Sequence, residues 1–371
     1  MRRILLLLLL LIGIAESHDP HRHGRMLLYP DIPGYVTLKA DLHQHTVFSD
    51  GEVWPTIRVE EALKDGLDAI SLTEHLEYQP HKNDIPHPDR NRAFALAVAA
   101  AKEKKLIVVN GSEITRRMPP GHSNAIFLSD ANKMLIPDSV EVFREAKRQG
   151  AFVFWNHPHW IGQVKDGAAK LTDVHKALLR ERLLDGIEVV NEDSYSDEAL
   201  QIALDHNLTM IGSSDIHGLI DWQYNVPEGR RPVTLIFASS RTDSAMKEAL
   251  FARRTVVSFN NTLIGREEFL LPLLQRCLTV ESAVYSGKTS VLVVKLRNNS
   301  SSDIILQNAG EYLFYDNTSV LTAPANSVTT LRVKTVQNLA SLQLKFTVLS
   351  AVTAPKTNPS LTIPVTVKTE K

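Results

Sequence analysis

The feature that most constrains the fold of this chain is a regular alternation of short apolar runs with longer segments of helical periodicity, from residue 37 to residue 253. The candidate strands are residues 37–41, 68–72, 106–109, 124–128, 152–155, 186–190, 208–211 and 233–237. The candidate helices between them are residues 56–63, 90–104, 139–149, 171–184, 197–205 and 243–253. Such alternation predicts parallel strands joined by helical crossovers. We therefore expect an α/β barrel or an open doubly wound sheet in this part of the chain.

The character of the sequence changes after Cys277. Val, Ile and Thr, which favour strands, supply 29 of the 94 residues from 278 to 371. The candidate strands with alternating polarity are residues 290–296, 303–307, 329–336, 341–349 and 361–368. Clusters of Asn, Ser, Asp and Pro separate these runs, a pattern typical of a small antiparallel sandwich. We predict two domains, an α/β barrel at residues 26–277 and an all-β sandwich at residues 278–371.

The first residues have the pattern of a secretory signal peptide. Arg2 and Arg3 precede an uninterrupted apolar run at residues 4–14, and Ala15-Glu16-Ser17 follows with small residues at its two ends. This run is shorter than the roughly 20 residues that a membrane span needs, and no later segment is long enough either. A buried N-terminal helix is the alternative. We predict a signal peptide at residues 1–17, cleaved near Ser17, and export of the protein to the periplasm or beyond.

The histidines are concentrated in the first part of the chain. The chain has 14 His and a single Cys, and no His lies beyond His217. One thiol forms neither an internal disulfide nor a thiolate zinc site. The formal net charge of −1 provides no basic surface for nucleic acid. These observations predict a site built from imidazole and carboxylate groups before residue 218.

The end of the first candidate strand carries two histidines on one face. Because strand side chains alternate between faces, Asp41, His43 and His45 point the same way and Leu42 points to the other side. Two adjacent imidazoles at a strand end are a simple pair of ligands for a divalent metal. Asp41 is a candidate to orient one of the imidazoles by accepting its N–H.

Similar polar groups recur at the ends of the other candidate strands. They are Thr73-Glu74-His75, Asn110-Gly111-Ser112-Glu113, Gly121-His122, Asn156-His157-Pro158 and Ser213-Ser214-Asp215-Ile216-His217. The carboxyl ends of barrel strands meet at one mouth, where barrel enzymes have their active sites. The set as a whole therefore predicts one metal site built from several strand ends.

These motifs, together with Ser49-Asp50-Gly51, resemble the PHP (polymerase and histidinol phosphatase) superfamily over residues 37–261. The resemblance implies a distorted seven-stranded β/α barrel that holds up to three divalent metal ions. It also implies a hydrolase that cleaves phosphate esters, here a phosphomonoester or a phosphodiester.

The resemblance also implies a ligand set. The first metal would be held by His43, His45, Glu113 and Asp215, the second by Glu113, His122 and His157, and the third by Asp50, His75 and His217. Imidazole and carboxylate ligands suit Zn, Mn or Fe, and we expect two to three such ions. A hydroxide that bridges two metals beside Glu113, with Asp215 and His217 nearby, would be the nucleophile.

Two positions depart from the family pattern, and several residues are candidates for substrate binding. Glu74 stands where the family most often has Asp, and His159 stands where small residues are common. We predict substrate contacts for Arg116, His159 and Tyr78, since a guanidinium binds phosphate in a bidentate manner. The segment that ends with Asn191 and Glu192 is a further candidate for the pocket wall.

Two other functions compete with phosphate-ester hydrolysis. A binuclear metal centre polarises a carbonyl group as well as a phosphoryl group, so an amidohydrolase or carboxylic esterase is one alternative. An exported binding protein that uses the sandwich is another, although a sandwich fold by itself implies no function. The expected partner is a small-molecule phosphate ester. We expect neither nucleic-acid binding nor a membrane span, and the sequence leaves the oligomeric state open.

Overall fold

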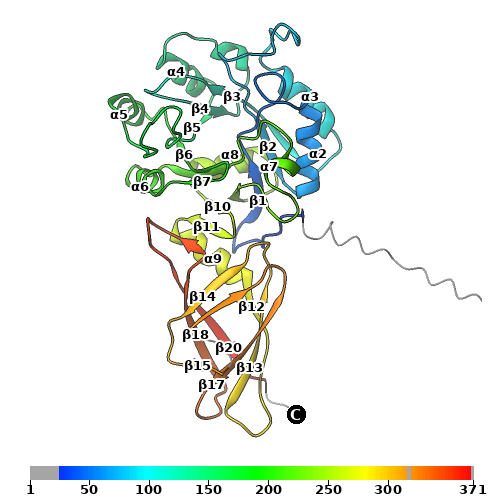
Figure 1. Cartoon of the computed structure of the whole chain (residues 1–371), viewed down its shortest axis with the longest axis vertical. Coiled ribbons are helices and arrows are strands. Elements are labelled where there is room, and N and C mark those ends of the chain that lie inside the picture. Colours follow the sequence, from blue (N-terminus) through cyan, green and yellow to red (C-terminus); the bar gives the residue numbers. More distant parts are fainter. Residues whose placement is uncertain (1–24, 316–318, 369–371) are drawn as a thin grey trace, which may run out of the picture.

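A computed structural model of the chain describes residues 25–315 and 319–368, and the predicted signal peptide lies outside these ranges. The strands of the first part are β1 (Val36–Asp41), β2 (Ala69–Leu72), β3 (Ile107–Ile114), β4 (Ser123–Ile126), β5 (Phe152–Trp155), β6 (Gly186–Asn191), β7 (Ser194–Tyr195), β8 (Thr209–Ser213), β9 (Val233–Ala238), β10 (Thr255–Phe259) and β11 (Thr262–Gly265). The α-helices are α2 (Pro55–Asp65), α3 (Arg92–Ala101), α4 (Glu141–Arg148), α5 (Asp173–Arg180), α6 (Asp197–Asp205), α7 (Ile220–Gln223), α8 (Asp243–Phe251) and α9 (Glu267–Cys277). Helices lie around the curled sheet (Figure 1), so strands such as β2 and β5 are buried along their whole length. None of the helices in the described ranges is long and apolar enough to cross a membrane.

The sheet of the first part is mixed, which corrects the expectation of parallel strands throughout. Its order is β19 (Ala351–Val352), β11, β10, β9, β1, β2, β3, β4, β5, β6 and β7, and β8 pairs with β6. The pairs β1–β2, β2–β3, β5–β6 and β6–β8 are parallel. The pairs β1–β9, β3–β4, β4–β5, β9–β10 and β10–β11 are antiparallel. The hairpin β10–β11, which the sequence pattern did not reveal, turns at Asn260 and Asn261 with φ of 44° and 62°, the left-handed backbone that such two-residue turns require.

The barrel closes without a continuous ladder of strand hydrogen bonds between β8 and β9. Thr234 of β9 replaces that ladder, because its Oγ1 accepts from Gly212 N at 3.0 Å and donates to Gly212 O at 2.8 Å. A Cβ on Gly212 would lie 2.2 Å from a methyl group of Val257, so only glycine lets the strands approach this closely. Beyond the strand ends, Asp215 N donates to His43 O at 2.9 Å. The closure therefore brings the two loops that follow β1 and β8 together.

Residues from 278 onward form two antiparallel four-stranded sheets. The strands are β12 (Leu278–Tyr285), β13 (Val291–Asn298), β14 (Ile304–Asn308), β15 (Leu313–Phe314), β16 (Val320–Ala323), β17 (Val328–Lys334), β18 (Ser341–Val348) and β20 (Ser360–Thr366). One sheet has the order β12-β13-β17-β15 and the other β16-β14-β18-β20. A bulge between Val280 and Ser282 interrupts the alternation in β12, which explains why the sequence pattern missed that strand. The expected fold class, a distorted α/β barrel followed by a small all-β sandwich, is confirmed.

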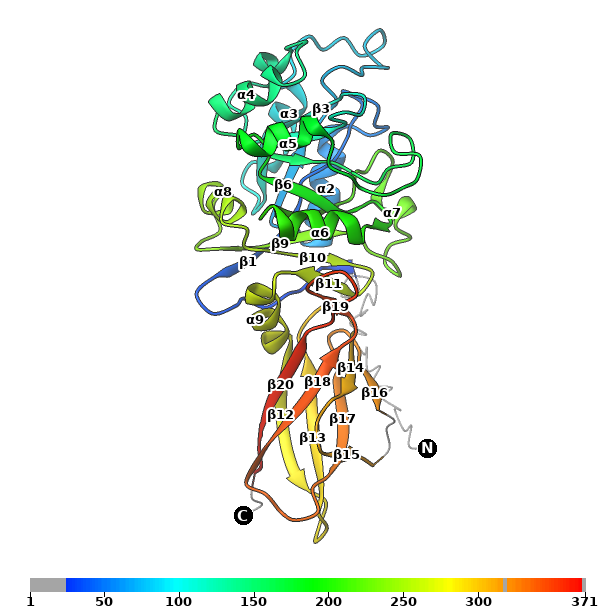
Figure 2. The ribbon, with the colours of Figure 1, turned by 90° about the vertical axis from the view of Figure 1, so that its left-hand side faces the viewer.

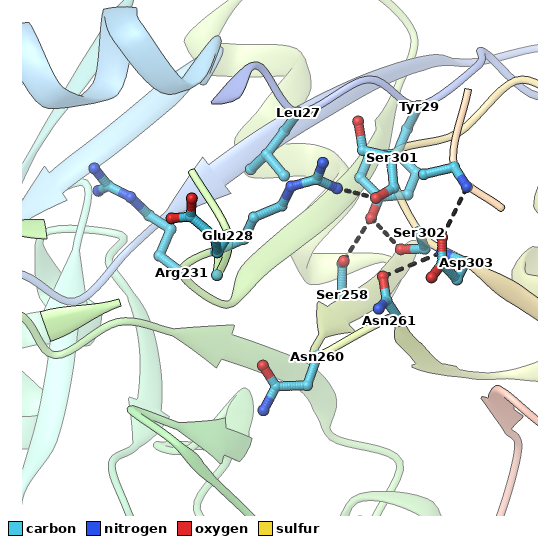
Figure 3. A pocket seen from close by; sticks show the side chains of 13 residues that line it. Leu27, Tyr29, Glu228, Arg231, Ser258, Asn260, Asn261, Ser301, Ser302 and Asp303 are labelled. Carbon is cyan, nitrogen blue, oxygen red and sulfur yellow. Dashed lines mark hydrogen bonds between the residues drawn. The ribbon is translucent and has the colours of Figure 1, made fainter. Parts of the chain in front are cut away.

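The sandwich is attached to the barrel by more than the chain connection at residue 278. Strand β19, which follows β18, pairs in parallel with β11 and joins the barrel sheet (Figure 2). The Tyr29 hydroxyl lies 2.6 Å from Ser258 Oγ of the barrel and 2.7 Å from Ser302 Oγ of the sandwich. A polar cavity of about 250 Å³ lies beside these hydroxyl groups (Figure 3). One hydrophobic core continues from the barrel into the sandwich, so the two parts stabilise each other.

Candidate metal centre

The nine predicted ligands lie together at one edge of the barrel sheet. Eight of them end or follow a strand: His43, His45 and Asp50 after β1, His75 after β2, Glu113 in β3, His157 after β5, and Asp215 and His217 after β8. His122 instead precedes β4, and because β4 runs antiparallel to β3, its first residue lies at the same edge. Backbone hydrogen bonds join neighbouring loops at this edge, such as that from His45 N to Ile216 O at 3.0 Å.

The first cluster of donor atoms combines His43, His45 and Asp215, all of which are buried. Asp215 Oδ1 lies 3.0 Å from His43 Nε2 and 3.0 Å from His45 Nε2. Two ligands at about 2.1 Å from a tetrahedral zinc ion are about 3.4 Å apart, so this spacing suits a shared cation. Glu113 Oε1 lies 3.7 Å from His43 Nε2, next to this cluster.

The second cluster surrounds Glu113, which is fully buried. Glu113 Oε1 lies 3.1 Å from His122 Nδ1 and 3.5 Å from His157 Nε2. The other carboxylate oxygen contacts His75 Nδ1. The structure groups His75 with Glu113 and His122, whereas the family resemblance assigns His157 to this position. His75 therefore lies between the second cluster and the third.

The third cluster is arranged around Asp50. Its carboxylate oxygens lie 3.3 Å from His75 Nε2 and 3.3 Å from His217 Nε2. His45 Nδ1 lies 3.6 Å from Asp50 Oδ1, so the imidazole of His45 lies between the first and third clusters. The three clusters share members and form one continuous centre.

Several buried polar atoms of this centre have no hydrogen-bond partner. They are Asp50 Oδ1, Glu113 Oε2, His122 Nδ1 and Asp215 Oδ1. Asp215 Oδ1 lies 3.0 Å from two imidazole nitrogens and still makes no hydrogen bond. Buried polar atoms normally have partners, so such atoms point to a missing partner. The donors and their arrangement fit divalent cations such as Zn, Mn or Fe.

The electrostatics of the centre also suit cations. Burial raises the pKa of Glu113, but the imidazoles of His75, His122 and His157 together outweigh burial and hold this pKa well below its usual range. Burial also raises the pKa of Asp215, but the imidazoles of His43 and His45 together outweigh burial. The pKa of Asp215 is therefore also well below its usual range. Burial and two neighbouring imidazoles lower the pKa of His45 to about 3. The two carboxyl groups are therefore ionised and His45 is neutral, which are the forms that bind metals.

Arg58 of α2 supports the backbone of two ligands, and the sequence analysis did not identify it. Its side chain is fully buried, and Nε donates to His45 O at 2.9 Å. Its terminal nitrogens donate to His217 O and Gly218 O, each at 2.8 Å, and to the Glu61 carboxylate at 2.8 Å. Arg58 thus joins the loops after β1 and β8.

Glu188 of β6 is a second functional residue that the sequence analysis missed. It is completely buried and accepts from His43 Nδ1 at 2.8 Å, His157 N at 2.7 Å and Asn191 Nδ2 at 2.8 Å, and also from the Ser213 hydroxyl. The carboxylate fixes the ring of His43 so that Nε2 faces the metal centre. A single acidic residue inside the apolar run 186–190 was the available signal.

Asp41, which the sequence analysis proposed for that orienting role, has different partners. It accepts from Ser214 Oγ at 2.6 Å and Ser214 N at 3.1 Å, and it forms an ion pair with Arg231 at 3.1 Å. Asp41 therefore supports the loop that carries Asp215, whereas Glu188 orients His43. The acceptor for the His43 imidazole therefore lies on β6, a strand that does not pair with β1.

Glu188→Gln is expected to lower metal affinity about 10- to 100-fold without unfolding the protein, a typical cost of losing a partner of a metal ligand. The carboxylate accepts hydrogen bonds from four donors, but the amide has only one acceptor oxygen. Some of these donors, which include His43 Nδ1 and His157 N, therefore lose their acceptor. Equilibrium competition with a chromogenic chelator measures the affinity. Glu181→Gln, at an exposed ion pair with Arg144, is the matched control and should bind metal normally. An unchanged affinity in Glu188→Gln would contradict the orienting role.

Glu74, the departure from the family pattern, supports the loop after β1. Its carboxylate accepts from Thr46 Oγ1 at 2.6 Å and from Ser49 Oγ at 2.5 Å. Ser49 Oγ in turn lies 3.2 Å from His45 Nδ1. The glutamate side chain therefore reaches the loop that carries His45.

The three residues predicted to bind substrate lie around the site and not in its wall. Arg116 forms an ion pair with Glu77. His159 Nε2 lies 2.8 Å from Ser194 Oγ, and Tyr78 is 53% exposed. None of the three lines the cavity beside the ligands, so their contact with substrate stays a prediction.

A cavity of about 180 Å³ opens beside the metal centre. Seven of its lining residues are predicted ligands, and the other three are Trp160, Asn191 and Glu192. Asn191 and Glu192, which the sequence pattern predicts for the pocket wall, both line the cavity. Trp160 was not predicted from the sequence. The feature that could have identified it is a large aromatic residue in a polar loop, three positions after His157.

Three residues at this cavity have positive φ without being glycine. The angle is 28° at His157, 49° at Asp215 and 51° at Glu192. Such conformations cost about 1–3 kcal/mol each and persist where the surrounding structure enforces them, often at functional sites. Here they occur at two predicted ligands and at a residue of the cavity wall.

Comparisons with known proteins identify relatives of both parts. Residues 278–364 match the family model DUF5001, an Ig-like domain. A solved structure from Bacteroides vulgatus, described as a two-domain protein containing a predicted PHP-like metal-dependent phosphoesterase, is 42% identical with a TM-score of 0.85 and covers 92% of this chain and 98% of that protein. A candidate metal-dependent phosphoesterase from Bifidobacterium adolescentis is 20% identical (TM-score 0.39, 48% of this chain, 88% of that one), and an amidohydrolase from Chromobacterium violaceum is 17% identical (TM-score 0.34, 48% and 87%). No curated protein sequence matches the chain.

Proposed function

Because this chain belongs to the family of PHP-like metal-dependent phosphoesterases, we propose that its barrel hydrolyses a small-molecule phosphate ester, either a monoester or a diester, at the centre formed by the nine ligands. The observation that carries this proposal is the convergence of three clusters of metal-binding side chains beside one cavity. Two to three divalent cations bound there would lower the pKa of a water molecule and neutralise phosphoryl oxygens.

The side chains of the centre position the reaction. Glu113 serves two clusters at once, since its Oε1 lies 3.1 Å from His122 Nδ1 and 3.7 Å from His43 Nε2. Asp215 is held from two sides, by the backbone hydrogen bond to His43 O and by Asn191 Nδ2 at 3.2 Å. Asp215 and His217 both line the cavity, where the phosphoryl group would lie. Fixed ligands of this kind reduce the reorganisation that the reaction requires.

The charge of the metal-loaded centre would suit a phosphate group. The three ligand carboxylates, Asp50, Glu113 and Asp215, contribute a charge of −3, and imidazoles that bind metal are neutral and contribute none. Two divalent cations change the sum to +1 and three change it to +3. A loaded site therefore attracts a phosphate dianion.

Removal of the metal is therefore expected to abolish hydrolysis, and reloading is expected to restore it. Chelator-treated protein and protein reloaded with Zn, Mn or Fe are assayed on p-nitrophenyl phosphate, bis(p-nitrophenyl) phosphate, p-nitrophenyl acetate and an anilide. We expect turnover of at least one phosphate ester only after reloading. Turnover of the acetate or the anilide, with no turnover of either phosphate ester, would identify a carbonyl hydrolase and refute the proposal.

We also propose that the protein is exported, with cleavage near Ser17 and with the sandwich at residues 278–371 as an accessory part of the barrel. The basic residues and the apolar run at residues 4–14 support export. Amino-terminal sequencing of the protein from the periplasmic fraction tests this, and a mature cytoplasmic chain that retains Met1 would contradict it.

A further inference from the structure

Trp160 lines the cavity beside the predicted ligands and is 47% exposed. Its ring centre lies 5.3 Å from that of His157 at an interplanar angle of 72°, and 5.9 Å from that of His122. Its backbone N donates to His157 O at 2.9 Å, and its carbonyl accepts from Val164 N at 2.9 Å. A half-exposed indole is thus held in a defined place against two predicted ligands.

The loop is built to leave room for this indole. A Cβ on Gly162 would lie 2.5 Å from Trp160 Cζ2 and less than 3.0 Å from two further ring atoms. Any other residue at this position would displace the ring. The absence of a side chain at Gly162 therefore leaves the space that the indole of Trp160 occupies beside the imidazoles.

Glu192 supplies a different group to the same cavity. Its backbone has the left-handed φ of 51°, which costs energy for a residue with a side chain. The neighbouring Asn191 uses its amide to bind Glu188 and Asp215. The Glu192 carboxylate, in contrast, has no hydrogen-bond or ion-pair partner among residues 25–315 and 319–368. It is an acceptor without a donor.

The size of the cavity determines where the alcohol part of a substrate lies. The volume of about 180 Å³ must hold the cations and the phosphoryl group. The alcohol part would therefore extend toward solvent, along the partly exposed lining residues Trp160 and Glu192. An indole offers a flat apolar face with negative charge density, which attracts the C–H face of a ring. A carboxylate only accepts hydrogen bonds, so it selects hydroxyl groups.

We propose that Trp160 and Glu192 form the subsite for the alcohol part of the substrate and select the phosphate ester of a sugar, whose ring packs on the indole while its hydroxyl groups donate to the carboxylate. This inference rests on the proposed phosphoesterase function for the reaction, and it adds the class of alcohol.

The test compares metal-loaded wild type with Trp160→Ala and Glu192→Ala on three kinds of monoester: a panel of hexose and pentose phosphates, phenyl phosphate and ethyl phosphate. We expect kcat/KM for the best sugar phosphate to exceed that for ethyl phosphate at least about tenfold, since stacking on an aromatic ring is worth about this much or more. Trp160→Ala should remove this advantage and also lower phenyl phosphate hydrolysis. Glu192→Ala should reduce only the sugar phosphate relative to the other two. Metal content should stay at the wild-type value in both variants.

Matched variants separate this role from structural damage. Trp160→Phe keeps an aromatic face and should retain most of the selectivity, whereas Gly162→Ala should lose it by displacing the indole. Trp222→Ala, which removes an 80% exposed Trp outside the cavity wall, should behave as wild type. An equal loss for all three monoesters, no loss for any, or loss of metal from Glu192→Ala would overturn the inference. A preference for phenyl phosphate that depends on Trp160 and not on Glu192 would replace the sugar by an aromatic alcohol.

If wild type hydrolyses neither these monoesters nor bis(p-nitrophenyl) phosphate, the proposed function fails and the subsite is still testable. The sugar phosphates are then not consumed, so calorimetric titration of the metal-loaded protein gives their Kd directly. Weaker binding of the sugar phosphate to Trp160→Ala and Glu192→Ala, with unchanged binding of ethyl phosphate, supports the subsite. Equal Kd values in wild type and both variants refute it.

Discussion

Glu113→Gln is expected to reduce phosphate-ester hydrolysis more than about 10³-fold and to lower the metal content by at least one equivalent. The substitution keeps the shape of the side chain but removes the charge that lies between His75, His122 and His157. Loss of one cation removes several kcal/mol of stabilisation of charge in the transition state, and about 4 kcal/mol corresponds to this factor. Metal analysis of the purified variant and steady-state kinetics measure the two effects.

His43→Ala and His157→Ala should abolish activity in the same way. His206→Ala is the control for a general effect of removing a histidine, because His206 is exposed at the end of α6, and its activity should be near normal. The ligand assignment would be wrong if Glu113→Gln kept its full metal content and activity.

Arg58→Met is expected to lower the free energy of unfolding by about 3–5 kcal/mol, since it removes one partner of a buried ion pair and leaves the other uncompensated. The unpaired groups are the Glu61 carboxylate and the carbonyls of His45, His217 and Gly218, which Arg58 binds at 2.8–2.9 Å. Urea unfolding of metal-free wild type and variant measures the difference, and the absence of metal separates folding from metal affinity.

Arg144→Met is the matched control for Arg58→Met. Arg144 also forms ion pairs with glutamates, but its side chain is 44% exposed and its ion pairs are screened by solvent, so its loss should leave the free energy of unfolding nearly unchanged. Equal destabilisation by the two substitutions would show that the burial of Arg58 does not determine its contribution to the free energy of unfolding.

The sequence was sufficient to predict which side chains meet. His43 and His45 follow one candidate strand, and His75 and Asp215 follow two others; the topology of a barrel brings such strand ends to one edge. His122 reaches the same edge for a different reason, because it begins an antiparallel strand. The pattern of polar residues at strand ends therefore located the centre even where the predicted strand direction was wrong.

The residues that hold the ligands in place were not predictable in the same way. Glu188 lies inside an apolar strand and Arg58 on a helix, and each acts on loops more than 100 residues away in the chain. Local periodicity describes which face a side chain occupies but not its partner on another element. For this reason Asp41, close in sequence to His43, was assigned the role that Glu188 has.

Strand β12 and helix α9 were not predicted from the sequence, and each contains a local irregularity that explains why. β12 contains a bulge that breaks its alternation. Helix α9, which connects the two parts, contains Pro272, a residue that normally argues against a helix interior. The tertiary core at the junction compensates for these local defects, and periodicity does not record such compensation.

If the nine predicted ligands hold the cations that catalyse hydrolysis, metal binding and activity must appear together. Titration of the metal-free protein with Zn, Mn or Fe, with bound metal and hydrolysis of phosphomonoesters and diesters measured on the same samples, tests this. We expect binding to saturate at two to three equivalents per chain and phosphate-ester hydrolysis to appear as these sites fill. Saturation at two to three equivalents with no hydrolysis of any phosphate ester, or hydrolysis at full rate in the metal-free protein, would contradict this expectation.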